Sequence, residues 1–265
     1  MARIYSEKEL IKRIEEQSND AEFYRIPALN YTGKTSEGCH YTEIIAKWLI
    51  EKWDSRKDEA ILLQKANMQE PEKEQSSPIH LEEKRQGKIK YSEGSNRDEE
   101  NIAKRLMEQE VLQVIDFPNT EVVDYQVPIN RVWHSTQGKA DLILVNERET
   151  IIGELKDDDS RETLLRAMVE AKTYTLKIVN YSFAKERFIR SYHHESIQPA
   201  VLFFENTQPW NDYLDMKAGN RIALQSLANK WDMLFFLVKT VGDIDKNVWK
   251  NNTFILEKLP SPFTK

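Results

Sequence analysis

Hydrophobic and polar residues follow two different periods along the chain, and the change of period separates expected helices from expected strands. Near the N-terminus, apolar residues recur at the three- and four-residue spacing of amphipathic helices, first behind Ser6 and again across residues 41–53. Ser6 followed by Glu9 is a capping box, which predicts that the first helix begins there. We therefore expect a helical region at residues 1–66.

The helical pattern is interrupted in residues 67–97, which are rich in Glu, Lys, Gln, Ser and Pro and contain few apolar residues. A segment of this composition cannot bury enough apolar surface to offset the entropy lost when a chain becomes ordered. We expect a polar linker or extended loop here. It would separate the N-terminal helical region from a main domain at residues 98–265.

The main domain shows regular periods. A helical pattern over residues 98–115 is followed by three strand patterns, at 121–129, 140–145 and 150–155, and Pro128 places the end of the first at a sheet edge or bulge. Next come a helix, a strand, a helix, a buried strand and an edge strand, at residues 160–180, 199–205, 213–230, 232–238 and 252–259. Three strands in a meander, then strands with helical crossovers, predict an α/β fold with a mixed central sheet and helices on both faces.

Composition narrows the class of protein only a little. The net charge of −6 gives this chain of 265 residues no overall basic surface, which counts against a passive nucleic-acid coat but not against an enzyme whose site collects carboxylates. Cys39 is the only cysteine, so an internal disulfide and a multi-cysteine zinc site are excluded. No signal peptide is evident, and no apolar run reaches the roughly 18 residues of a spanning helix. We expect a cytoplasmic protein with no membrane partner.

The candidate chemistry lies in one hairpin. Two apolar runs, in the stretch KADLILVNERETIIGELK that begins at Lys139, are joined by the polar residues 146–149. Asp141 stands at the outer end of the first run, and Glu154 and Lys156 stand at the outer end of the second. Charged residues are rare at buried strand ends unless they are paired. Their role therefore depends on whether they meet in space.

The register of the hairpin predicts that they do meet. Pairing Val145 with Thr150 across the polar turn places Asp141 opposite Glu154, and Lys156 shares their face because it lies two residues further along. Two opposed carboxylates repel each other unless a cation lies between them, and oxygen ligands suit Mg²⁺ or Mn²⁺. Metal, water and an ammonium group are the components of phosphodiester hydrolysis. Ordinary surface salt bridges at strand ends are the alternative interpretation.

The segments GKADLILV and IIGELK resemble the core motif of the PD-(D/E)XK nuclease superfamily. This is the restriction-endonuclease-like fold of many restriction enzymes, RecB-type exonucleases and Holliday-junction resolvases, and the expected order of elements is the order of that family's core. The resemblance covers roughly residues 98–239 and implies an αβββαβ core. It also implies that Asp141, Glu154 and the Leu155 carbonyl bind the metal, and that Lys156 is the catalytic lysine.

Residues outside the core motif follow the family's pattern to different degrees. Ala140 stands where the family name has Pro, at a position that varies widely. The family commonly adds an acid from the helix before the meander, which makes Glu99 a catalytic candidate, although a first-turn Glu is also favoured by the helix dipole. Glu170 and Tyr174 resemble the Gln-x-x-x-Tyr element of RecB-type nucleases, with Glu in place of Gln. Glu170 would hold water or a second metal, and the alternative is that the two residues are an ordinary surface pair. Lys139 is a candidate phosphate contact.

The sequence thus predicts a nuclease that depends on Mg²⁺ or Mn²⁺, and it favours a DNA endonuclease. The N-terminal region would recognise the substrate or a partner. One site cuts one strand, so coordinated cleavage of a duplex would require a homodimer. Three alternatives stay open. They are an RNase or exonuclease on the same fold, a non-catalytic nucleic-acid-binding or assembly subunit, and an unrelated α/β interaction protein whose charges meet by chance.

Overall fold

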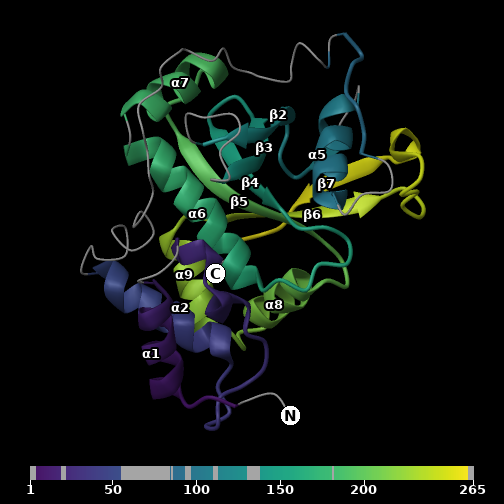
Figure 1. The fold of residues 1–265 in the computed structure, drawn as a ribbon. Coiled ribbons are helices and arrows are strands. Elements are labelled where there is room, and N and C mark those ends of the chain that lie inside the picture. The colour runs from purple at the N-terminus through teal and green to yellow at the C-terminus, as the bar shows by residue number, and fades with distance from the viewer. Residues whose placement is uncertain are drawn as a thin grey trace.

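A mixed sheet of seven strands forms the centre of the described structure, in the order β1-β7-β6-β5-β4-β3-β2, with helices against both faces (Figure 1). The computed structural model describes residues 4–18, 22–54, 84, 86–92, 97–109, 113–129, 138–180 and 182–261. The strands are β1 (Gln113–Ile115), β2 (Glu121–Pro128), β3 (Lys139–Val145), β4 (Thr150–Leu155), β5 (Ile197–Phe204), β6 (Leu234–Thr240) and β7 (Phe254–Lys258). The helices are α1 (Glu7–Ser18), α2 (Tyr41–Asp54), α5 (Asp98–Glu108), α6 (Leu164–Asn180), α7 (Ser182–Tyr192), α8 (Gln208–Lys217) and α9 (Ile222–Lys230), with the short 3-10 helices η1 (Phe23–Arg25), η2 (Pro27–Asn30) and η3 (Trp249–Asn251).

The β3–β4 hairpin has the expected register, since Val145 pairs with Thr150 and Ile143 with Ile152. β2 pairs with the other side of β3 and is an edge of the sheet, which agrees with the position of Pro128. β4, β5 and β6 run parallel to one another. Their carboxyl ends therefore lie along one edge of the sheet, and this is where the second half of the candidate motif ends.

The two faces of the sheet are covered by different helices. α6 packs on β4 and β5 on one face, whereas α5 packs on β2 and β3 on the other (Figure 1). Side chains of β3 alternate between the two: Ile143 lies in the core beneath α6, and Leu142 and Leu144 lie in the core beneath α5. The mixed sheet with helices on both faces that we expected is confirmed.

The first helix begins as the capping box predicts. The Ser6 N–H donates to Glu9 Oε2 at 2.9 Å, and the Glu9 N–H donates to Ser6 Oγ at 3.3 Å. Together these bonds satisfy two of the backbone N–H groups that every helix leaves unpaired at its start. Helix α2 also lies where the pattern over residues 41–53 predicts it.

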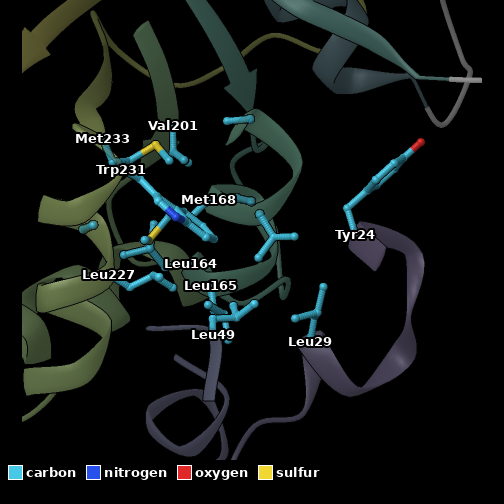
Figure 2. Packing of buried hydrophobic residues seen from close by; sticks show 14 of the residues in the cluster. Tyr24, Leu29, Leu49, Leu164, Leu165, Met168, Val201, Leu227, Trp231 and Met233 are labelled. Carbon is cyan, nitrogen blue, oxygen red and sulfur yellow. The ribbon is translucent and has the colours of Figure 1, made fainter. Parts of the chain in front are cut away.

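The N-terminal helices pack into the same core as the sheet. α2 lies against α9, and Leu29 and Leu49 belong to the buried cluster that also contains Leu164 and Trp231 (Figure 2). Most of the expected linker, residues 67–97, lies outside the described residues. The division of the chain into domains therefore stays a prediction. No helix among the described residues has the length and apolar character needed to cross a membrane.

Two expectations at the far edge of the sheet are wrong. The helix expected over residues 98–115 ends at Glu108. Residues 113–115, expected to be its last turn, instead form strand β1, which pairs in parallel with β7. The β-branched Val114 and Ile115 suit a strand, and the open side of β7 provides the pairing partner that selects this conformation. As a result β7 is not the edge strand that we expected, because β1 covers it.

The single helix expected over residues 213–230 is in fact two helices, α8 and α9. Gly219 has a φ angle of +79°, and its N–H donates to the Met216 carbonyl at 3.1 Å. Glycine adopts this left-handed conformation without steric penalty and so ends helices. α6 begins at Leu164 rather than near residue 160, because the Leu164 N–H is capped by Asp212 of α8 at 3.0 Å.

Candidate active site

Asp141 and Glu154 come from the paired strands β3 and β4, at the end where the ladder stops. The last pair of the ladder is Leu142 with Gly153, one position before the two acids. In place of a further backbone pair, the Asp141 carboxylate accepts the Leu155 N–H through Oδ2 at 2.9 Å. The Asp141 side chain therefore lies at the splayed end of the hairpin, and its nearby negative charge contributes to the raised pKa of Glu154.

Lys156 lies at the centre of the site. Among the described residues, four carboxylates surround its Nζ: Glu154 at 2.7 Å, Glu162 at 3.0 Å, Glu99 at 3.7 Å and Glu170 at 3.9 Å. They come from β4, the loop that follows it, α5 and α6, so four separate segments converge here. The Lys156 and Glu154 side chains are only 5% and 4% exposed. The Lys156–Glu154 pair is therefore a buried ion pair rather than an exposed salt bridge at the end of a strand.

Burial and mutual repulsion change the protonation behaviour of these groups. Burial raises the pKa of Asp141 to about 6 and that of Glu99 to about 7, although the Lys156 charge opposes both shifts. Burial, followed by the charges of Asp141 and Glu170, raises the pKa of Glu154 well above its ordinary value. Burial would lower the pKa of Lys156, but the surrounding carboxylates outweigh it and raise that pKa well above its ordinary value. The lysine is therefore charged, and the acids around it exceed it in number.

Not every buried carboxylate oxygen of the cluster has a hydrogen-bond partner in the described part of the chain. Glu154 Oε2 is buried and lacks a hydrogen-bond partner among the described residues. The two Asp141 oxygens each accept one hydrogen bond, from Gln126 Nε2 at 2.7 Å and from the Leu155 N–H. In the described part of the chain, no group of three or more His, Cys, Asp or Glu side chains is placed to hold a metal ion. Mg²⁺ commonly binds through one or two carboxylates and completes its shell with water and phosphate oxygens.

The predicted substrate residues take different positions. Tyr174 is 3% exposed and donates its hydroxyl to Glu170 Oε1 at 2.7 Å, so the two do share a helix face, directed toward Lys156. Gly138 allows this, because a Cβ at that position would lie 2.3 Å from Tyr174 Cε1. Lys139 is the first residue of β3 and is half-buried. Tyr174 is thus placed to support Glu170 from within the fold.

Glu162 and Gln126 belong to the site but were not expected from the sequence. Glu162 precedes Thr163, whose N–H donates to Asn30 Oδ1 at 3.1 Å and whose hydroxyl donates to the Leu29 carbonyl at 2.5 Å. Asn30 and Leu29 precede Thr163 by 133 and 134 residues in the sequence, so no local sequence pattern indicates these contacts. The N-terminal region therefore fixes the loop that brings Glu162 to the lysine.

Comparisons of the chain with protein-family models, curated proteins and solved structures found no match. The chemistry of the site is therefore inferred from its geometry. Buried acids from neighbouring strands, beside a lysine that keeps its charge, form an arrangement suited to holding a divalent cation next to a fixed positive group.

Proposed function

We propose that this protein is a metal-dependent nuclease of the restriction-endonuclease-like fold that hydrolyses phosphodiester bonds in DNA. The observation that carries the proposal is the buried convergence of Asp141, Glu154 and Lys156 at the end of the β3–β4 hairpin. The order α5, β2, β3, β4, α6, β5 supports the proposal, apart from the added α7, because it follows the αβββαβ core of that superfamily.

The acids fit a hard divalent cation. Asp141, Glu154 and the Leu155 carbonyl would hold Mg²⁺ or Mn²⁺, since all three offer oxygen ligands. Burying carboxylates next to one another is unfavourable. Glu154 Oε2 has no hydrogen-bond partner among the described residues, so no protein group there offsets the free-energy cost of burying it, and a bound cation would do so. When bound, such an ion polarises a phosphate oxygen and lowers the pKa of a water molecule.

Lys156 supplies a fixed positive charge beside these acids. Its Nζ is held 2.7 Å from Glu154 Oε1 and stays protonated because the carboxylates raise its pKa. A desolvated ammonium in this place orients the attacking water and stabilises negative charge as it grows on the phosphate oxygens. Losing one such preorganised group typically lowers the rate by about 100- to 1,000-fold.

Glu99 is suited to proton transfer. It lies in the first turn of α5, 3.7 Å from Lys156 Nζ, and burial raises its pKa to about 7. A carboxyl group whose pKa is close to the working pH accepts and releases protons efficiently. Its side chain is 37% exposed, which gives water access to it. We assign to Glu99 the acceptance of the proton from the attacking water.

The remaining predicted residues have supporting roles in this proposal. Lys139, two residues before Asp141 on β3, would contact a phosphate of the substrate. Glu170, which Tyr174 holds by a 2.7 Å hydrogen bond, keeps the Lys156 ammonium in place. A homodimer would supply the second site that coordinated cleavage of both strands requires.

The proposal is tested by incubating supercoiled plasmid with the full chain and Mg²⁺ or Mn²⁺. We expect nicking or linearisation that is lost in Asp141→Ala and Lys156→Ala and kept in Lys217→Ala, a matched change at an exposed residue of α8. End-labelled linear DNA and RNA, incubated in parallel, distinguish an endonuclease from an exonuclease and from an RNase. Activity that persists in both site variants would contradict the assignment of the site.

If the wild-type protein cuts none of these substrates, thermal unfolding with and without Mn²⁺ separates the remaining possibilities. A cation site adds stability by mass action, by about 2.7 kcal/mol at a hundredfold excess over Kd. If Mn²⁺ stabilises the wild-type protein but not Asp141→Ala, the protein has an intact metal site and is a non-catalytic or inactive member of the proposed fold family. No stabilisation would favour an unrelated α/β protein whose charges meet by chance.

A further inference from the structure

A strained residue in the middle of a strand contacts the candidate site. Gln126 of β2 has a φ angle of +47° and donates its side-chain N–H to Asp141 Oδ1 at 2.7 Å. The other non-glycine residues with positive φ in the described chain lie outside the strands, and all are Asp, Asn or His. Those residue types tolerate the left-handed region, whereas Gln does so much less readily. Strain of this kind persists only where the surrounding structure imposes it, and it is concentrated at functional sites.

The register of β2 explains how Gln126 reaches this place. The pairing of β2 with β3 shifts by one residue between Val122 and Asp124, which is a β-bulge. Beyond the bulge, the register places Gln126 opposite Asp141; without the extra residue, Tyr125 would stand there instead. Bulges redirect side chains in this way and are common next to active sites. Two irregularities of the same strand, the bulge and the positive φ, therefore bring one amide to the carboxylate.

We infer that Gln126 is a positioning residue that fixes the orientation of the Asp141 carboxylate for cation binding, an inference that rests on the proposed function. The Gln126 amide and the Leu155 N–H donate to different oxygens of Asp141. Rotation of the carboxylate breaks at least one of these bonds, so together they hold it in one orientation. The group that faces Asp141 is the Gln126 Nε2, a hydrogen-bond donor that does not itself bind a cation. Removing such a partner of a metal ligand typically lowers metal affinity or activity by about 10- to 100-fold.

Two variants distinguish the effect of losing the Gln126 amide from the effect of the strained backbone at this position. Gln126→Gly and Gln126→Ala both remove the amide and differ from each other by one methyl group. Glycine adopts a φ of +47° without penalty, whereas alanine does not. We expect the glycine variant to melt at a higher temperature than the alanine variant, and both to bind Mn²⁺ about 10- to 100-fold more weakly than wild type. A residue with a purely structural role would change stability and Mn²⁺ affinity together.

The experiment is calorimetric titration of the full chain with Mn²⁺, alongside thermal unfolding and plasmid cleavage, for wild type, both Gln126 variants and Asp141→Ala. Weakened Mn²⁺ binding in a Gln126→Gly protein that folds at least as stably as Gln126→Ala supports the inference. Wild-type affinity in Gln126→Gly overturns it while leaving the proposed function intact. A Gln126→Gly protein less stable than Gln126→Ala overturns the strain argument. A wild-type protein that neither binds Mn²⁺ nor cuts nucleic acid overturns the proposed function, and the positioning role fails with it.

Discussion

Replacing Lys156 by methionine removes the charge at the centre of the site and keeps most of the side-chain volume. The attraction between Nζ and Glu154 Oε1 at 2.7 Å amounts to about 6 kcal/mol for an effective dielectric constant of about 20. Much of it is offset because the ammonium was removed from water on folding. The variant nevertheless retains the buried carboxylates without their counter-charge. Breaking a buried pair in this way costs about 3–5 kcal/mol of unfolding free energy.

This loss should depend on pH and on divalent cations. Without the lysine, the pKa of Glu154 in the folded protein rises further above its unfolded value, because the charge that lowered it is gone. The folded state therefore binds a larger excess of protons over the unfolded state in the variant than in the wild type, so the variant gains more stability than the wild type as the pH falls. The deficit is therefore expected to be larger at pH 8 than at pH 5. Mn²⁺ at pH 8 should recover part of it, because the cation supplies the missing positive charge.

Urea unfolding followed by circular dichroism measures these free energies. Lys217→Met, on the exposed end of α8, is the matched control and should change stability little. The double variant Lys156→Met with Glu154→Gln should lose less than Lys156→Met alone, because the unpaired charge is also removed. A loss below about 1 kcal/mol for Lys156→Met, the value of an exposed ion pair, would refute the reasoning.

Three further predictions follow from contacts around the site. Gly138→Ala would force the Tyr174 ring to move, since the added Cβ lies 2.3 Å from Tyr174 Cε1; cleavage should fall while Mn²⁺ affinity changes little, and unchanged cleavage would contradict this. Glu99→Gln removes a carboxyl group whose pKa is raised to about 7, so stability should decline less steeply than in the wild type as the pH rises from about 4.5 to 7, with the remaining decline due to the other buried acids such as Asp141. A wild-type slope of thermal stability against pH in Glu99→Gln would show that Glu99 is not among the groups that titrate in this range. Asn30→Ala leaves the Thr163 N–H without its acceptor and should cost about 1–3 kcal/mol of unfolding free energy and lower the cleavage rate, whereas full activity would show that the loop needs no support from the N-terminal region.

The hairpin was predictable because its information is local. A polar turn between two apolar runs fixes which residues pair, and a shift of one residue would turn every side chain to the wrong face. The register from Val145 and Thr150 therefore led directly to Asp141, Glu154 and Lys156. The helical periods near Ser6 were equally informative, since a capping box and an apolar stripe agree on where the helix begins.

The rest of the site depends on contacts that no local pattern records. Glu162 reaches Lys156 because an N-terminal segment, 133 residues away, binds the backbone of the next residue. Gln126 faces Asp141 only because a bulge shifts β2 by one residue, and bulges have no strong sequence signature. Helix α7 was not expected from the sequence either. Among its described side chains only Phe188 and Tyr192 are buried, so its apolar pattern is too short to indicate a helix. β1 likewise forms because β7 offers it an open edge.

The rate of plasmid nicking by wild type and by Lys156→Ala, at an Mn²⁺ concentration that saturates both, tests the central claim most directly. We expect metal-dependent nicking by the wild type and a rate about 100- to 1,000-fold lower in the variant, because Lys156 acts on the transition state rather than on cation binding alone. Equal rates in the two proteins, or nicking that persists after the metal is chelated, would contradict the proposal that this site is the catalytic centre of a metal-dependent nuclease.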